Sequence, residues 1–226
     1  MILCLETSGK WCSVSLSSSG LTIAYAESAE EWSHSRQITL MIKEVLDVAQ
    51  IQISSLTAVA VSKGPGSYTG LRVGASCAKG ICFAQDIPLL ALPTLQIIAA
   101  EIATAPDVQS KRIIPMIDAR RQEVYFAAYN HHLVELEPAQ NKILDESAFI
   151  EAQGEPLIFC GDGAFKMDKY VLNGDNWAIR KSHASAKHMA NLASERLQKG
   201  QIEDTAYFIP FYLKPPNITK SKKTLF

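Results

Sequence analysis

The chain has 226 residues, of which 47% are hydrophobic and 20% charged, and its formal net charge is -1. This composition is typical of a folded protein and excludes a chain that is disordered throughout. The nearly neutral charge excludes a whole-molecule field that would attract RNA or a membrane surface, so any such contact needs a local patch.

Three further features indicate where the protein works. The five cysteines are odd in number and form no C-x-x-C pair, which favours reduced thiols over a disulfide framework or a zinc site. The first apolar stretch contains Glu6 and follows no cationic run, unlike a signal peptide. The longest apolar stretch, residues 87–100, is broken by prolines and is too short to cross about 30 Å of hydrocarbon. We therefore expect a cytoplasmic protein without a membrane-spanning segment.

Hydrophobic periodicity predicts a first half that begins with three antiparallel strands and continues with alternating helices and strands. A period of two marks the strands, and apolar stripes of period 3.6 mark the helices. The expected elements are strands at 2–6, 11–17 and 21–26, a helix at 33–50, a strand at 56–62, a glycine-rich turn at 64–69, a helix at 70–84, a strand at 88–92 and a helix at 94–103.

The pattern restarts near residue 112, where an apolar strand again ends in an acid and is followed by a turn and an alternating strand. This repetition predicts two similar α/β halves, residues 1–107 and 108–213, with a lysine-bearing tail at 214–226. The last helix is free to pack back onto the first half. The elements expected in the second half are strands at 113–118, 123–129 and 132–137, a helix at 145–152, a strand at 157–160, a short helix at 164–170 and a longer helix at 185–199.

The glycine-rich turn between a strand and a helix is a candidate anion site, because free backbone N–H groups and the positive helix end meet there. Its candidate binding residues are Gly64, Gly66 and Ser67. The turn lacks the Gly-Lys-Ser/Thr ending of a P-loop, and Thr69 stands where G-x-G-x-x-G has its third glycine. A tight turn that simply needs glycine backbone angles is an equally good explanation.

Two acids, Glu6 and Asp118, each end the first strand of a half and precede a turn. In a duplicated two-lobed fold both carboxylates would point into the cleft between the lobes, where they could hold Mg²⁺ through waters or act as a general base. The alternative is that each accepts hydrogen bonds from the N–H groups of its turn. Arg120 and Arg121 beside Asp118 would lower its pKa or contact phosphate.

The histidines and serines form no familiar catalytic or metal-binding motif. His131 and His132 are adjacent, His183 and His188 are five residues apart, and the sequence contains neither H-x-x-x-H nor G-x-S-x-G. We therefore predict that this chain has no metal ligands and no catalytic residues of its own.

Small residues recur on one face of the helix predicted at 70–84. Gly70, Gly74 and Ala78 follow one another at a spacing of four, and each glycine costs a helix about 1 kcal/mol relative to alanine. A neighbour must therefore approach this backbone closely, either an internal element or the helix of a partner. On the preceding helix, Leu40 lies on the otherwise polar side and is left facing solvent.

Four segments run in order over nearly the whole chain: Leu5 to Ser8, Ser62 to Gly74, Asp118 to Arg120 with Glu123 to Tyr125, and Pro210 to Leu213. Together they resemble the TsaB family, also called YeaZ, and the G-P-G-S-Y-T-G-L-R run is the most specific of them. The resemblance implies an α/β, actin-like ATPase (ASKHA) fold with two RNase H-like lobes, in which helices flank mixed sheets. It further implies the non-catalytic subunit of the bacterial machinery that makes threonylcarbamoyladenosine in tRNA.

The catalytic relative, TsaD, is a glycoprotease-like protein that carries a metal-binding H-x-x-x-H on the helix after an I-P-L strand. Thr94 and Ile98 stand at the two histidine positions here. Because neither a hydroxyl nor an alkyl group replaces imidazole as a ligand, the chain looks like an inactive paralogue. Gly161 lies in a shortened nucleotide-site turn that lacks the asparagine of the relative. The resemblance thus implies no cofactor of its own, with ATP-Mg used by the complex.

The first functional hypothesis is a scaffold that binds and activates a TsaD-like catalytic subunit and, through it, a TsaE-like ATPase. In the resembled family the first two helices of the first lobe pair with the same helices of the catalytic subunit. Without that partner the chain can pair with itself as a homodimer. The predicted partner interface consists of Leu40, Gly70, Arg72, Gly74 and Ala78.

Two other functions stay open, and the tail adds a possible RNA contact. One function is an actin-like ATP-binding kinase or ATPase, and the weaker one is a metallopeptidase. The tail contains no acid, so it predicts a contact with tRNA phosphates, although a merely solubilising tail would look the same. The kinase would bind ATP-Mg through Glu6, Gly64, Gly66, Ser67, Asp118 and Gly161, and the tail lysines are Lys214, Lys220, Lys222 and Lys223.

Overall fold

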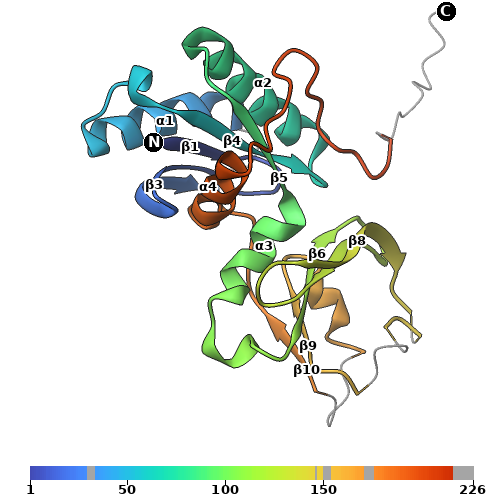
Figure 1. Ribbon diagram of the computed structural model, residues 1–226. Coiled ribbons are helices and arrows are strands. Elements are labelled where there is room, and N and C mark those ends of the chain that lie inside the picture. The colour runs from blue at the N-terminus through green and yellow to red at the C-terminus, as the bar shows by residue number, and fades with distance from the viewer. Residues whose placement is uncertain (30–33, 146, 150–153, 171–175, 216–226) are drawn as a thin grey trace, which may run out of the picture.

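The computed structural model describes residues 1–29, 34–145, 147–149, 154–170 and 176–215. It shows an α/β protein with two lobes, each built on a five-stranded mixed sheet (Figure 1). The predicted two-lobed α/β fold is therefore confirmed. The five cysteines are all free thiols. Within the described ranges, no helix combines the length and the apolar character that crossing a bilayer requires.

The first lobe follows the predicted order of strands and helices. Its elements are β1 (Ile2–Glu6), β2 (Cys12–Ser18), β3 (Leu21–Ser28), α1 (His34–Ala49), η1 (Ile53–Ser55), β4 (Ala58–Gly64), α2 (Tyr68–Gln85), β5 (Leu89–Pro93) and α3 (Thr94–Ala103). The strand order is β3-β2-β1-β4-β5, with β1 antiparallel to β2 and parallel to β4.

The second lobe repeats this plan. Its elements are η2 (Pro106–Val108), β6 (Arg112–Asp118), β7 (Glu123–Tyr129), β8 (Glu135–Ile143), β9 (Leu157–Cys160), η4 (Ala164–Met167) and β10 (Trp177–Arg180), followed by η5 (Ala186–His188) and α4 (Ala190–Gln198). Its strand order is β10-β9-β6-β7-β8, so β6 takes the central position that β1 has in the first lobe.

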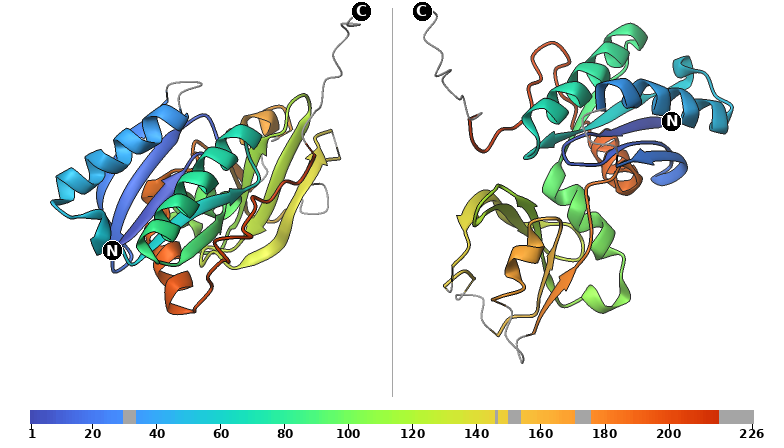
Figure 2. Two further views of the ribbon diagram at one scale, coloured as in Figure 1. Left: turned by 90° about the horizontal axis from the view of Figure 1, so that it is seen from above. Right: turned by 180° about the vertical axis from the view of Figure 1, so that it is seen from behind.

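Helices cover both faces of the first sheet. Side chains of β1 alternate between these two faces, so the strand contributes to a core on each side. Leu3 and Leu5 join the core under α1 and α2, whereas Ile2 and Cys4 join the core that includes α3 and α4. α3 also packs on β6, so it lies between the two sheets (Figures 1 and 2). α4 follows the strands of the second lobe in the sequence, but it packs on β1, β2 and β5 of the first lobe.

Some elements differ from their predicted bounds. β8 begins at Glu135 rather than 132, because Asn130 Oδ1 accepts the N–H groups of His132 and Val134 and forms a tight turn. The helix expected at 185–199 is divided into η5 and α4. The helix expected at 145–152 lies partly outside the described residues, and residues 147–149 form a turn. The short strand β10 was not predicted.

After α4 the chain returns across the first lobe in residues 203–215, which include a turn at 205–207 and which we call the C-terminal strap. The Lys79 ammonium of α2 donates to the Phe208 carbonyl oxygen at 3.2 Å, and the Phe211 N–H donates to the Lys63 carbonyl oxygen at 2.6 Å. The strap is therefore tied to both α2 and β4.

The predicted basic tail is described only at its beginning. Lys214 contacts the second lobe, where its ammonium binds both carboxylate oxygens of Glu123. This lysine is therefore not a free charge. Lys220, Lys222 and Lys223 lie outside the described residues, and the predicted contact of the tail with tRNA stays a prediction.

Candidate functional site

The glycine-rich turn packs directly against the β1–β2 turn. The Ser67 N–H donates to the Ser8 carbonyl oxygen at 2.6 Å, and Ser67 Oγ accepts the Gly70 N–H at 3.2 Å as the N-cap of α2. A Cβ on Gly70 would stand 2.0 Å from the Thr7 carbonyl oxygen, and one on Gly66 would stand 2.5 Å from that of Ser8. These glycines allow two backbones to touch, which supports the tight-turn explanation over an anion site.

Gly64, at the end of β4, and Gly161, directly after β9, also allow another backbone to approach closely. A Cβ on Gly64 would stand 2.3 Å from the Phe211 carbonyl oxygen, and one on Gly161 would stand 2.2 Å from the Met116 carbonyl oxygen. Both residues also have positive φ angles, 112° and 94°, which favour glycine. Packing alone therefore accounts for both glycines, and nucleotide binding by them stays a prediction.

Glu6 is fully buried. Its Oε1 accepts the Ser8 N–H at 2.6 Å, as the turn explanation requires. Burial raises the pKa of Glu6, and the hydrogen bonds from Ser8 offset that rise only in part. The enclosed carboxylate and its bond to Ser8 therefore support the turn explanation, and a role of Glu6 in the cleft between the lobes stays a prediction.

Asp118 lies at the start of the β6–β7 turn and is half exposed. Its Oδ1 accepts the Arg120 backbone N–H and the Lys166 ammonium, both at 2.6 Å, and its N–H donates to Asp162 Oδ1 at 3.0 Å. Within the described residues, the guanidinium groups of Arg120 and Arg121 form no ion pair with this carboxylate. The cation that binds Asp118 is therefore Lys166, which the sequence did not indicate.

Two cavities lie away from these residues. One, of about 600 Å³, is between α1 and α2, and the other, of about 720 Å³, is between the β2–β3 turn, α3 and α4. Neither of these two cavities is a candidate ATP site, and ATP binding stays a prediction. Neither cavity is lined by any of the six candidate nucleotide residues, Glu6, Gly64, Gly66, Ser67, Asp118 and Gly161.

α3 carries the two positions that correspond to the metal-binding histidines in the resemblance to TsaD. Thr94 begins the helix and Ile98 lies one turn later, and both side chains are buried. In the part of the chain that the structure describes, no three His, Cys, Asp or Glu residues gather closely enough to hold a metal ion. Threonine and isoleucine here supply a hydroxyl and an alkyl group, which do not make a metal site.

The small-residue row of α2 faces the interior. A Cβ on Gly74 would stand 2.4 Å from Thr7 Oγ1 and 3.3 Å from Val61 Cγ2. Thr7 Oγ1 itself donates to the Gly70 carbonyl oxygen at 2.8 Å, and Ala78 is fully buried. The prediction that Gly70, Gly74 and Ala78 contact a partner is therefore wrong, because the β1–β2 turn and β4 already occupy that face.

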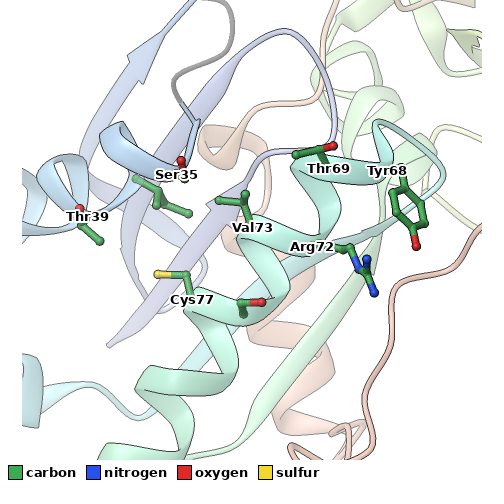
Figure 3. Close-up of a pocket in the computed structure, with 9 residues that line it drawn as sticks. Ser35, Thr39, Tyr68, Thr69, Arg72, Val73 and Cys77 are labelled. Atoms are coloured by element: carbon green, nitrogen blue, oxygen red, sulfur yellow. The ribbon is translucent and has the colours of Figure 1, made fainter. Parts of the chain in front are cut away.

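Another face of α2 borders the open groove between α1 and α2 (Figure 3). Arg72 is exposed there, with its guanidinium carbon 4.9 Å from the centroid of the Tyr68 ring. Leu40 of α1 is 62% exposed. These two predicted interface residues therefore face solvent, and their contact with a partner stays a prediction. The groove is lined by Ser35, Ile38 and Thr39 of α1 and by Tyr68, Thr69, Arg72, Val73, Ser76 and Cys77 of α2.

A second row of small residues follows this outer side of α2. Thr69, Val73, Ser76 and Gly80 recur at spacings of four, three and four, and all except Val73 are exposed. A Cβ on Gly80 would meet nothing within 4 Å. The sequence signal was a spacing of three and four residues, which places these side chains on one helix face, and reading the helix for a second small-residue row would have found it.

Comparison with known proteins identifies the family. A family model described as "TsaD: tRNA N6-adenosine threonylcarbamoyltransferase" matches residues 28–222. The "tRNA threonylcarbamoyladenosine biosynthesis protein TsaB" of Bacillus subtilis (strain 168) is 30% identical over 164 residues, which are 71% of this chain and 70% of that protein. The chain belongs to the TsaB family.

The TsaB of Haemophilus influenzae is 36% identical over 126 residues, 56% of this chain and 52% of that protein, so the chain spans about half the length of this relative. The structure of YeaZ from Pseudomonas aeruginosa matches with a TM-score of 0.75 and 25% identity, covering 94% of this chain and 99% of that chain. The TsaB (YeaZ) resemblance and the actin-like ATPase fold predicted from it are therefore confirmed.

Proposed function

We propose that the protein is a non-catalytic subunit in the biosynthesis of threonylcarbamoyladenosine in tRNA, and that it binds and activates a TsaD-like catalytic subunit. Family membership supports the pathway, because the TsaB relatives are named for it. The observation that carries the proposal is the pair Thr94 and Ile98 in a TsaD-like fold. With no imidazole at these positions, the chemistry is left to a partner.

The docking face that we propose is the groove between α1 and α2. It keeps Arg72 from the sequence prediction and adds Ser76, both of which line the groove. Beyond the groove lining, the face extends to two exposed residues, Leu40 of α1 and Gly80 of α2. Small side chains at Ser76 and Gly80 let a partner helix approach α2 to the low end of the usual 8–10 Å axis separation. Leu40 supplies an apolar contact, and Arg72 a charged group at the rim, as in other protein interfaces.

The proposed docking face also determines how the chain meets its other partners. A TsaE-like ATPase joins through the catalytic subunit, so ATP-Mg is used by the complex and not held by this chain. When the catalytic subunit is absent, the same face pairs two copies of the chain as a homodimer. Self-association and partner binding then compete, and adding the catalytic subunit should dissociate the homodimer.

The proposal is tested by co-elution with the TsaD-like protein of the same host on a sizing column. Leu40→Asp places a charge on the docking face and should abolish co-elution while the chain stays folded. Leu21→Asp is the matched control, since Leu21 is 71% exposed on β3, outside the groove. Normal co-elution of Leu40→Asp, or equal loss in both variants, would contradict the docking face.

ATP titration of the isolated chain separates this proposal from the actin-like kinase. A ligand at 100 times its Kd stabilises a protein by about 2.7 kcal/mol, which a thermal melt detects readily. We expect no change in Tm with ATP-Mg. An ATP-dependent rise in Tm that Asp118→Asn removes would favour the kinase instead.

A further inference from the structure

The β6–β7 turn holds two consecutive arginines, Arg120 and Arg121, in the left-handed backbone region, with φ of 73° and 50°. Asn and Gly normally occupy such positions, because a larger side chain disfavours these angles. Both arginines are exposed, and neither forms an ion pair with another described residue. We call this pair the arginine tip. Strained backbone that presents two free guanidinium groups points to a function other than folding.

The acids beside the arginine tip are already bound by other cations. Lys166 binds Asp118 at 2.6 Å, and Lys214 of the C-terminal strap binds both carboxylate oxygens of Glu123. Because these two pairs neutralise Asp118 and Glu123, neither carboxylate compensates the charge of the arginine tip. That charge is available to an anionic partner.

The C-terminal strap, drawn in red in Figure 1, contacts β7 through Lys214 and Glu123 and also carries aromatic side chains. Three residues before Lys214, the ring of Phe211 is 43% exposed. The ring of Tyr212 lies 4.8 Å from that of Tyr68 at the start of α2. The Glu123 N–H donates to the Arg120 carbonyl oxygen at 3.0 Å, so Glu123 links the arginine tip to Lys214, three residues after the exposed Phe211.

We propose that the arginine tip and Phe211 form an RNA-binding strip, in which the guanidinium groups bind phosphates and the ring stacks on an unpaired base. Guanidinium forks match the geometry of phosphate oxygens, and basic groups next to aromatic rings are typical of single-stranded RNA sites. An acidic protein would use the arginines but would have no need of the ring. The strip rests on the proposed function only for the identity of the RNA as a tRNA.

The test is binding of the full chain to a fluorescent tRNA transcript over a series of salt concentrations. Arg120→Asn combined with Arg121→Gly removes both charges and gives the turn the residues it prefers, so the variant should melt no lower than the wild type. At about 0.1 M salt its affinity should fall roughly ten- to fiftyfold, and the salt slope should fall by about 1.5. Lys187→Gln combined with Lys199→Gln removes the same charge from η5 and the end of α4 and should change neither.

Phe211→Ala separates stacking from charge. It should weaken tRNA binding about tenfold and leave the salt slope unchanged, because no phosphate contact is lost. The Phe211 N–H that donates to Lys63 is a backbone group and is kept in this variant.

Three results would overturn the strip. They are no measurable binding of the wild-type chain at low salt, an equal loss in the lysine control, and displacement of the RNA by polyglutamate as efficiently as by unlabelled RNA. The last result would assign the arginine tip to an acidic protein. Because the arginine variant should still co-elute with the TsaD-like subunit, failure of the strip leaves the proposed function standing, and loss of co-elution would implicate the docking face instead.

Discussion

The two small-residue rows of α2 each follow one face of the helix, but their surroundings are opposite. Along the inner row, Gly70 and Gly74 leave no room for a Cβ, because Thr7 lies against both. Along the outer row, Gly80 has open space and Ser76 is exposed beside the groove. An internal backbone contact accounts for the inner row, and the outer row fits the surface that we propose for a partner. Substitutions on the inner row should therefore affect folding, and those on the outer row should affect binding.

The largest loss of unfolding free energy is expected from substitution of Gly70. A Cβ there would stand 2.0 Å from the Thr7 carbonyl oxygen, a backbone atom held in the β1–β2 turn. Gly70→Ala should therefore lower the free energy of unfolding by about 3 kcal/mol or more, because one of the two backbones must move. Urea unfolding measures this change, and a wild-type midpoint would show that the contact is not tight.

Substitution of Gly74 should lower the free energy of unfolding less, because the atom nearest to the added Cβ is a side-chain atom, Thr7 Oγ1, at 2.4 Å. We expect Gly74→Ala to cost about 1–3 kcal/mol of unfolding free energy. In a double-mutant cycle with Thr7→Ala, the combined cost should be smaller than the sum of the two single costs, because the shorter side chain removes the clash. Strictly additive costs would mean that Gly74 and Thr7 do not touch.

Glu6 supports the turn on which the inner row packs, and it carries a pH dependence. Burial raises the pKa of Glu6 above its ordinary 4.5, so the folded chain holds this proton more tightly than the unfolded chain does. The resulting stability is present below the unfolded pKa and is lost as pH rises through the folded pKa. Glu6→Gln is permanently neutral and should raise Tm at neutral pH more than at pH 4. An equal change in Tm at both pH values would contradict the burial of this carboxylate.

The smallest effect is expected on the outer row. Gly80 is exposed inside a helix, and a Cβ there meets nothing within 4 Å. Gly80→Ala should raise the free energy of unfolding by up to about 1 kcal/mol through helix propensity alone. Thermal melts of the isolated chain measure the gain, and a loss of stability would show that the outer row is packed against something.

Sequence periodicity was enough to predict the order of elements in the first lobe, because the helices carry apolar stripes of period 3.6 and the strands are either continuously apolar or alternate with a period of two. Periodicity failed where contacts between residues far apart in the sequence determine what packs against a side chain. The neighbour of Gly70 is Thr7, 63 residues earlier in the chain, so spacing could identify a shared helix face but not what packs on it. The enclosure of Glu6 and the binding of Asp118 by Lys166 depend on tertiary contacts in the same way. Leu40 was predictable because an apolar residue among polar ones on a helix surface needs no distant partner to be recognised.

The docking face is tested most sharply by the affinity of the Ser76→Trp variant for the TsaD-like subunit, measured by titration calorimetry. The variant puts a large side chain on the outer row without touching the inner one, so the isolated chain should keep its wild-type Tm. We expect its Kd to rise at least a hundredfold, about 2.7 kcal/mol of binding free energy, while Lys181→Trp in the second lobe binds normally. A folded Ser76→Trp variant with wild-type affinity would contradict the central claim that the outer row of α2 is the partner face.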